Sequence, residues 1–143
     1  MTAGLSTTIH ASCVSWHDRG VLLAGPSGAG KSDLALRLID AGAVLVADDL
    51  VAVTRDGAGL RARPQALPGL IELRGQGIYR VAHCPETALD LYVRLGGAAP
   101  DRLPEAGATF SLLDAELPLL DLDPRLPSAV ARLRLAVCGT RVH

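Results

Sequence analysis

The sequence predicts a mixed α/β fold, and three observations support this prediction. The chain has 143 residues, of which 49% are hydrophobic, which is enough for one buried core. Residues 21–47 follow a strand–loop–helix–strand pattern that is typical of α/β proteins. Short apolar runs separated by Gly- and Pro-rich turns follow residue 50, which indicates added antiparallel strands. We therefore expect residues 1–143 to form a single domain around a mixed sheet.

The N-terminal third is expected to contain three strands and one helix. Residues 6–15 are expected to form an edge strand or a strand beside the next one. Residues 21–24 are a short apolar run that stops at a Gly-Pro-Ser-Gly turn, which is typical of a buried strand. Residues 31–41 place apolar side chains on one face of a helix, and Gly42 supplies a stop signal. Residues 43–47 form a second β-prone run that ends at two aspartates.

The remainder of the chain is expected to be mainly β-structure. Residues 51–54 and 59–63 are predicted to form a hairpin about residues 55–58, with Asp56-Gly57 as the turn signal. Residues 128–138 alternate apolar and basic side chains, a pattern that fits either a strand or a short helix. Residues 118–126 contain two prolines among leucines and receive no assignment. Residues 70–73 form a short apolar run, and a flexible Gly-Gln-Gly turn separates them from residues 78–81. Strands are expected at residues 89–95 and 109–113, with a Gly- and Pro-rich loop at residues 96–107 between them.

Composition argues against nucleic-acid and membrane partners. The formal net charge is -1 with acids and bases mixed along the chain, so no basic tract is available for nucleic-acid phosphates. No run approaches the roughly 20 apolar residues that span a bilayer. The N-terminus also lacks a charged segment followed by an apolar block. We expect a cytoplasmic protein.

The three cysteines do not indicate a disulfide framework or a structural zinc site. Cys13, Cys84 and Cys138 are far apart, odd in number and outside CxxC spacing. We expect them to be reduced thiols, with two or three of them buried.

The strongest motif lies between the predicted strand at residues 21–24 and the predicted helix. The pattern G-x-x-x-x-G-K-[ST] is matched by Gly25, Pro26, Ser27, Gly28, Ala29, Gly30, Lys31 and Ser32. In such a P-loop, successive backbone N–H groups and the helix dipole bind phosphate. The lysine reaches the β- and γ-phosphates of ATP, and the serine hydroxyl binds Mg2+. The alternative is a Gly-rich turn that carries an exposed lysine.

An acidic pair follows the second apolar strand. Asp48 and Asp49 stand where a carboxylate would face the metal of a P-loop site. Adjacent strand residues point to opposite faces, so one carboxylate is expected to address the metal and nucleophile while the other is structural. The alternative is a pair that caps a turn. The motif upstream favours the functional interpretation.

Four ordered segments resemble the HPr kinase/phosphorylase family. They are His10, GVLLAGPSGAGKS at residues 20–32, VLVADD at residues 44–49 and LIELRGQGI at residues 70–78. The last block, after a strand that ends in Asp-Asp, is close to a family signature. The resemblance covers residues 9–81 well.

The resemblance implies a fold and a set of site residues. The fold would be a P-loop nucleotide-binding domain with a mixed sheet, similar to phosphoenolpyruvate carboxykinase. Lys31 would bind phosphate, and the pair Asp48 and Asp49 would supply the base for the acceptor hydroxyl, with Asp49 the favoured member. Magnesium would be held by Ser32, Asp48 and Glu72. The other implied active-site residues are His10, Arg74 and Arg102.

The resemblance also implies a substrate and an assembly. The substrate would be a serine of the phosphocarrier protein HPr, with phosphorolysis as the reverse activity, and relatives form hexamers. This chain resembles a truncated form without the family's N-terminal domain, and residues 122–128 offer only Arg125 where the family has a basic loop linked to phosphate release. The alternatives are a small-molecule kinase and a nucleotide sensor without catalysis.

Overall fold

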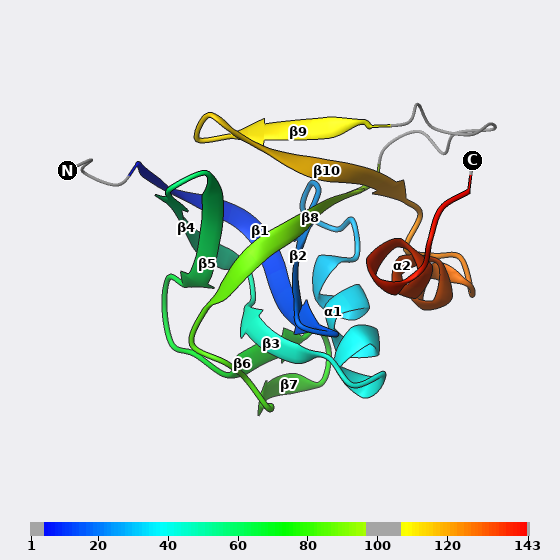
Figure 1. Ribbon diagram of the computed structural model, residues 1–143. Coiled ribbons are helices and arrows are strands. Elements are labelled where there is room, and N and C mark those ends of the chain that lie inside the picture. The colour runs from blue at the N-terminus through cyan, green and yellow to red at the C-terminus, as the bar shows by residue number, and fades with distance from the viewer. Residues whose placement is uncertain (1–4, 97–106, 143) are drawn as a thin grey trace.

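The computed structural model describes residues 5–96 and 107–142. These residues form a mixed α/β fold with a large sheet, a separate hairpin and two helices (Figure 1). The strands are β1 Ser6–Trp16, β2 Arg19–Ala24, β3 Val44–Ala47, β4 Leu50–Asp56, β5 Gly59–Pro64, β6 Leu70–Leu73, β7 Gly77–Arg80, β8 Thr87–Leu95, β9 Thr109–Leu112 and β10 Ala115–Leu122. The helices are α1 Lys31–Asp40 and α2 Ala129–Cys138.

The large sheet is organised around the long strand β1. Its first half pairs with β4 and its second half pairs with β2 and β3, all antiparallel. Strand β4 pairs with β5, β5 pairs with β8, and β8 pairs with β2 in parallel. The pairings β1–β4–β5–β8–β2–β1 therefore close into a ring. Strand β10 extends this ring as a parallel neighbour of β8, and β9 completes the edge.

Several strands end at the same edge of the sheet. Strands β2, β8 and β10 run parallel to one another, and β3 runs with them because both β2 and β3 are antiparallel to β1. The chain leaves β2 at this edge, forms the loop at residues 25–30 and enters α1. In parallel sheets this edge is where ligands bind, because loops and helix N-termini gather there.

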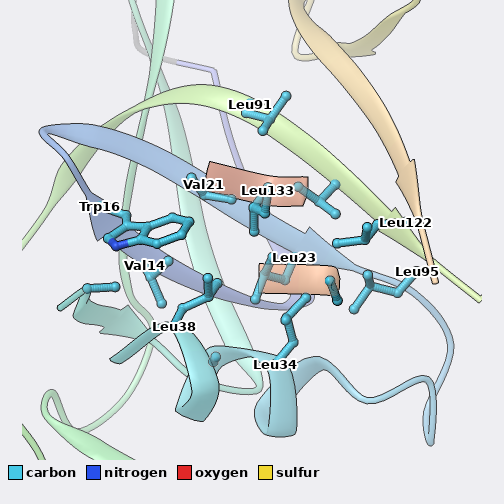
Figure 2. Close-up of a cluster of buried hydrophobic side chains, with 14 of the residues drawn as sticks. Val14, Trp16, Val21, Leu23, Leu34, Leu38, Leu91, Leu95, Leu122 and Leu133 are labelled. Carbon is cyan, nitrogen blue, oxygen red and sulfur yellow. The ribbon is translucent and has the colours of Figure 1, made fainter. Parts of the chain in front are cut away.

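Two hydrophobic cores lie on opposite sides of β1 and β2. The helix-side core joins Val14, Trp16 and Leu23 to Leu34 and Leu38 of α1 and to residues of β8, β10 and α2 (Figure 2). The second core contains the alternate residues of the same strands together with side chains of β4 and β5. This division follows from the period-two alternation of strand side chains. It is the reason that the end of β2, residues 21–24, is a continuous apolar run.

Most predicted elements are confirmed, and the structure assigns the two segments whose secondary structure the sequence left undecided. Helix α1, the strand before it and the hairpin about residues 55–58 form where the sequence predicts them, with Asp56 the last residue of β4 and the turn at residues 57 and 58. Residues 129–138 form helix α2, in which Ala129 and Leu133 share the buried face. Residues 115–122 form β10, which pairs with β9 up to Pro118 and with β8 from Leu119 onward. The proline thus lies where the strand changes partners.

The expectation that two or three cysteines are buried is wrong. Cys13 is buried, Cys84 is half-buried and Cys138 is exposed. Helix α2 continues its buried stripe from Leu133 to the half-buried Val137, so the next residue, Cys138, turns toward solvent. Burial raises the pKa of the Cys13 thiol, and it also raises the pKa of Cys84.

No helix within the described ranges is long and apolar enough to cross a membrane.

Candidate active site

The loop from Gly25 to Gly30 turns sharply at the end of β2. Gly25 has φ 158°, and a Cβ there would lie 2.7 Å from the carbonyl oxygen of Leu95, so only glycine lets β2 and the end of β8 come this close. Gly30 has φ 97° and caps α1 in the left-handed conformation. The ring of Pro124 lies against Gly30, because a Cβ atom on Gly30 would be 3.5 Å from the Cγ atom of that proline. The loop is therefore held by the ends of β8 and β10.

Lys31 lies over the loop. Its Nζ donates hydrogen bonds to the carbonyl oxygens of Gly25, at 2.7 Å, and of Pro26, at 3.0 Å. The carbonyl groups occupy two of the three donors of the ammonium group. This arrangement keeps the positive charge beside the loop backbone and the N-terminus of α1, where partial positive charge is also concentrated. The three features together favour the binding of an anion.

Asp48 joins three segments that are distant in the sequence. Its Oδ1 atom accepts hydrogen bonds from the hydroxyl of Ser32, at 2.7 Å, and from the hydroxyl of Ser12, at 2.8 Å. Its Oδ2 atom accepts a longer hydrogen bond of 3.3 Å from the backbone N–H of Glu72. The half-buried carboxylate thus connects β1, the first turn of α1 and strand β6.

Strand β6 brings Glu72 to this carboxylate. Ile71 is buried in the helix-side core, and β6 packs against α1, while the adjacent Glu72 faces solvent. Within residues 5–96 and 107–142, no group of three His, Cys, Asp or Glu side chains is arranged to hold a metal ion. Magnesium that is bound with phosphates keeps several waters and requires only one or two protein carboxylates. The hydroxyl of Ser32 and the carboxylate of Asp48 supply oxygen donors of the type that magnesium prefers.

Asp49 and His10 form a second, exposed pair. The His10 Nδ1 and Asp49 Oδ1 atoms are 4.0 Å apart, and the side chains are 79% and 80% exposed. Both aspartates lie beyond the end of β3, and Asp49 adopts φ 71°. The two carboxylates diverge, as expected, but the cause is this left-handed backbone rather than strand alternation. The backbone carbonyl of Asp49 accepts a hydrogen bond from the Ala11 N–H. This bond holds Asp49 beside β1, the strand that carries His10.

Of the two predicted arginines, only Arg74 lies among the described residues, and no hydrogen bond or ion pair joins it to this cluster. Arg74 lies exposed in the turn between β6 and β7, and its side chain has no hydrogen bond or ion pair to any described residue. Arg102 lies outside the described residues. Arg125, in contrast, follows the proline that packs against Gly30 and forms an ion pair with Asp123. The hydrogen bonds from Arg125 lower the pKa of Asp123.

Sequence reasoning did not identify Ser12, although the structure places it against Asp48. Ser12 is the one polar or charged side chain that is fully buried among the described residues. The available signal was a serine inside the apolar run Ala11 to Val14. A polar residue in a buried strand usually has a hydrogen-bond partner, because an unpaired buried hydroxyl is costly.

The fold and this edge of the sheet define the class of protein. It is a mixed α/β protein in which a Gly-rich loop leaves a central strand, begins a helix and lies beside an aspartate at the end of another strand. The chain belongs to the family described as HPr Serine kinase C-terminal domain, whose family model matches residues 3–123.

Similar proteins agree with this assignment. The chain is 33% identical over 133 residues to the HPr kinase/phosphorylase of Geobacillus thermodenitrificans, a match that covers 84% of this chain and 43% of that protein. It is 35% identical over 132 residues to the protein of the same name from Exiguobacterium sp., with coverage of 83% and 42%. The chain therefore spans less than half the length of these relatives.

A solved structure has the same fold. The Hpr(Ser) kinase/phosphatase from Coxiella burnetii matches with a TM-score of 0.74 and 25% sequence identity. The match covers 94% of this chain and 99% of that chain. The likeness therefore extends over nearly the whole of both chains.

Proposed function

We propose that this chain is the catalytic domain of an ATP-dependent serine kinase that acts on the phosphocarrier protein HPr. The observation that carries this proposal is the 2.7 Å hydrogen bond between Ser32 of the Gly-rich loop and Asp48. It joins the two parts that a P-loop phosphotransferase requires, the phosphate-binding helix start and the acidic strand end. Membership of the HPr Serine kinase C-terminal domain family supports the substrate.

In this proposal, residues 25–32 form a P-loop of the type found in phosphoenolpyruvate carboxykinase. The backbone N–H groups of the loop bind the β-phosphate of ATP, and Lys31 moves its ammonium group from the carbonyls of Gly25 and Pro26 to the β- and γ-phosphates. Ser32, Asp48 and Glu72 hold Mg2+, directly or through water. When bound, Mg2+ neutralises charge that develops on the phosphates.

Asp49 is the base for the acceptor serine. Its carboxylate is exposed and is therefore free to accept a hydrogen bond from the hydroxyl of an incoming protein. It orients that hydroxyl and takes its proton as the phosphoryl group moves to the oxygen. His10, whose Nδ1 atom is 4.0 Å from Oδ1 of Asp49, helps to set the position of this carboxylate. Arg74 and Arg102 remain candidates for binding phosphate or substrate.

The experiment incubates the purified chain with γ-labelled ATP, Mg2+ and HPr and uses mass spectrometry to detect phosphoserine. We expect label on one serine of HPr, and omission of Mg2+ should abolish it. Addition of inorganic phosphate then tests phosphorolysis, which would remove the label. Nucleotide binding without transfer to HPr would contradict the proposal and favour a small-molecule kinase or a nucleotide sensor. Light scattering of the same sample tests the hexamer that the family resemblance implies.

A further inference from the structure

Ser12 occupies an unusual place for a hydroxyl group. Its side chain is fully buried on β1, opposite Leu23 of β2, and its neighbours along the same face of the strand include Val14 and Trp16 of the helix-side core. An aliphatic residue would suit this position at least as well for packing alone. The hydroxyl is satisfied by a single described partner, Oδ1 of Asp48, at 2.8 Å.

The same oxygen of Asp48 also accepts the hydroxyl of Ser32. An ionised carboxylate has about four acceptor positions, two on each oxygen. The two serines therefore occupy both positions of Oδ1, and the Glu72 N–H uses one position of Oδ2. Ser32 donates its proton to Asp48, so the lone pairs of its oxygen point away from the carboxylate. They are then available to a metal ion beside the loop.

The two serines differ in exposure and in how the surrounding backbone is paired. Ser32 lies in the first turn of α1 and is only half-buried, whereas Ser12 lies inside a strand that is paired on both sides. Ser12 therefore provides the rigid anchor of the carboxylate. Charge-assisted hydrogen bonds of this kind are short and directional, so they restrict the rotation of the Asp48 side chain.

We propose that Ser12 is a positioning residue for magnesium: it fixes the Asp48 carboxylate so that this group orients the Ser32 hydroxyl toward the metal. This inference rests on the proposed function. Residues that orient metal ligands through hydrogen bonds typically change metal affinity or activity by about 10- to 100-fold when they are replaced. Ser12 touches neither nucleotide nor acceptor in this scheme, so it acts through Asp48 and is not itself catalytic.

The test compares substitutions that differ in one hydroxyl. Ser12→Thr and Ser12→Val have nearly the same shape, but only the threonine can donate to Asp48. Ser12→Ala removes the hydroxyl without adding volume. Ser15→Ala is the matched control, because Ser15 is on the same strand and has no side-chain hydrogen bond to a described residue.

The readout is binding of a fluorescent, non-hydrolysable ATP analogue, titrated with Mg2+ and repeated in EDTA. We expect Ser12→Ala and Ser12→Val to raise the half-saturating Mg2+ concentration about tenfold. Ser12→Val should need about tenfold more Mg2+ than Ser12→Thr, whereas Ser15→Ala should match the wild type. Binding in EDTA should not change. Any general packing defect would be common to the threonine and valine variants, so their difference isolates the hydroxyl.

Two outcomes separate this inference from the proposed function. If the wild type shows Mg2+-dependent binding and Ser12→Val responds to Mg2+ as Ser12→Thr does, the positioning role is overturned while the proposed function stands. If the wild type binds no nucleotide under any condition, the proposed function fails and the inference fails with it. A loss of binding that is equal with Mg2+ and with EDTA would assign Ser12 a purely structural role and would also overturn the inference.

Discussion

The hydroxyl of Ser32 donates a 2.7 Å hydrogen bond to Oδ1 of Asp48, which lies 16 residues further along the chain. This bond connects the first turn of α1 to the end of β3. Since both groups are proposed to serve the same Mg2+, we expect Ser32→Ala to weaken Mg2+-dependent nucleotide binding at least tenfold. Ser32→Thr keeps the hydroxyl and should retain most of the binding. Equal Mg2+ titrations for the two variants would contradict the role of the hydroxyl.

Lys31 is the only lysine in the chain, which permits a direct test of its role. Its ammonium group now bonds to the carbonyls of Gly25 and Pro26, and we expect ATP to draw it to the phosphates. ATP should therefore protect Lys31 from an amine-reactive reagent, as read by mass spectrometry. Lys31→Ala should reduce ATP affinity by at least tenfold, since a charged hydrogen bond contributes about 1.5–3 kcal/mol. The N-terminal amine is the internal control, and equal modification with and without ATP would refute the contact.

Asp49 should affect transfer but not nucleotide binding. Asp49→Asn preserves the size of the exposed side chain and removes its ability to accept a proton. We expect phosphate transfer to HPr to fall by about 100-fold or more, while the affinity for the ATP analogue stays within about twofold. Asp48→Asn is the informative comparison, because it should instead raise the Mg2+ requirement. Retained transfer by Asp49→Asn would rule out Asp49 as the base.

Gly20 is predicted to be essential for stability. A Cβ on Gly20 would overlap the carbonyl oxygen of Ala88 where β2 pairs with β8, and the Gly20 N–H also donates to Asp90. We expect Gly20→Ala to lower the free energy of unfolding by about 3 kcal/mol, or to prevent folding, because backbone atoms would have to move. The measurement is urea denaturation followed by the fluorescence of Trp16, the only tryptophan.

Gly59→Ala is the matched control for this substitution. A Cβ at Gly59 has only the carbonyl oxygen of Asp56 nearby, at 3.8 Å, and no positive φ is involved. Its unfolding midpoint should stay close to that of the wild type. Similar midpoints for Gly20→Ala and Gly59→Ala would show that the β2–β8 pairing tolerates a side chain.

The buried thiol of Cys13 should make stability depend on alkaline pH. Burial raises its pKa in the folded protein above the ordinary value of 9.0, so above pH 9 the unfolded chain loses this proton more readily than the folded protein does. The free energy of unfolding should therefore fall as pH rises above 9, by up to about 1.4 kcal/mol per pH unit. The stabilising contribution is fully present below pH 9.

Cys13→Ala should have a shallower alkaline decline than the wild type, even if its stability at neutral pH is lower. Urea denaturation at several pH values measures both quantities. As a check on burial, an alkylating reagent should modify the exposed Cys138 first and Cys13 only after unfolding. Parallel declines in the two proteins would indicate that other groups cause the pH dependence.

Local patterns were sufficient for elements that bury one face. Helix α1 has its apolar residues on one side and Gly42 after its end, and the hairpin between β4 and β5 turns at residues 57 and 58, one residue beyond the start of the Asp56-Gly57 signal. Both signals depend only on neighbouring residues. Helix α2 was ambiguous because its alternating residues fit two periods, and the packing of Ala129 and Leu133 against the helix-side core decided between them.

The candidate site likewise combines features that the sequence predicts with features that depend on how the chain folds. The loop motif at residues 25–32 and the acidic pair Asp48-Asp49 could be recognised in the sequence, because the residues of each feature are contiguous. The inward turn of Asp48 to Ser32 and the exposure of Asp49 beside His10 depend on the folded arrangement and could not be predicted from neighbouring residues. The left-handed backbone of Asp49 separates the two carboxylates.

The contact between Ser12 and Asp48 also depends on the folded arrangement. Its burial and its bond to Asp48 depend on β1 pairing with strands on both sides, among them β3, which ends just before that aspartate. Such pairings are hydrogen-bonded ladders between segments that are far apart in the chain, and no local periodicity specifies them. The sequence therefore contained the parts of the site, and strand pairing determined which of them meet.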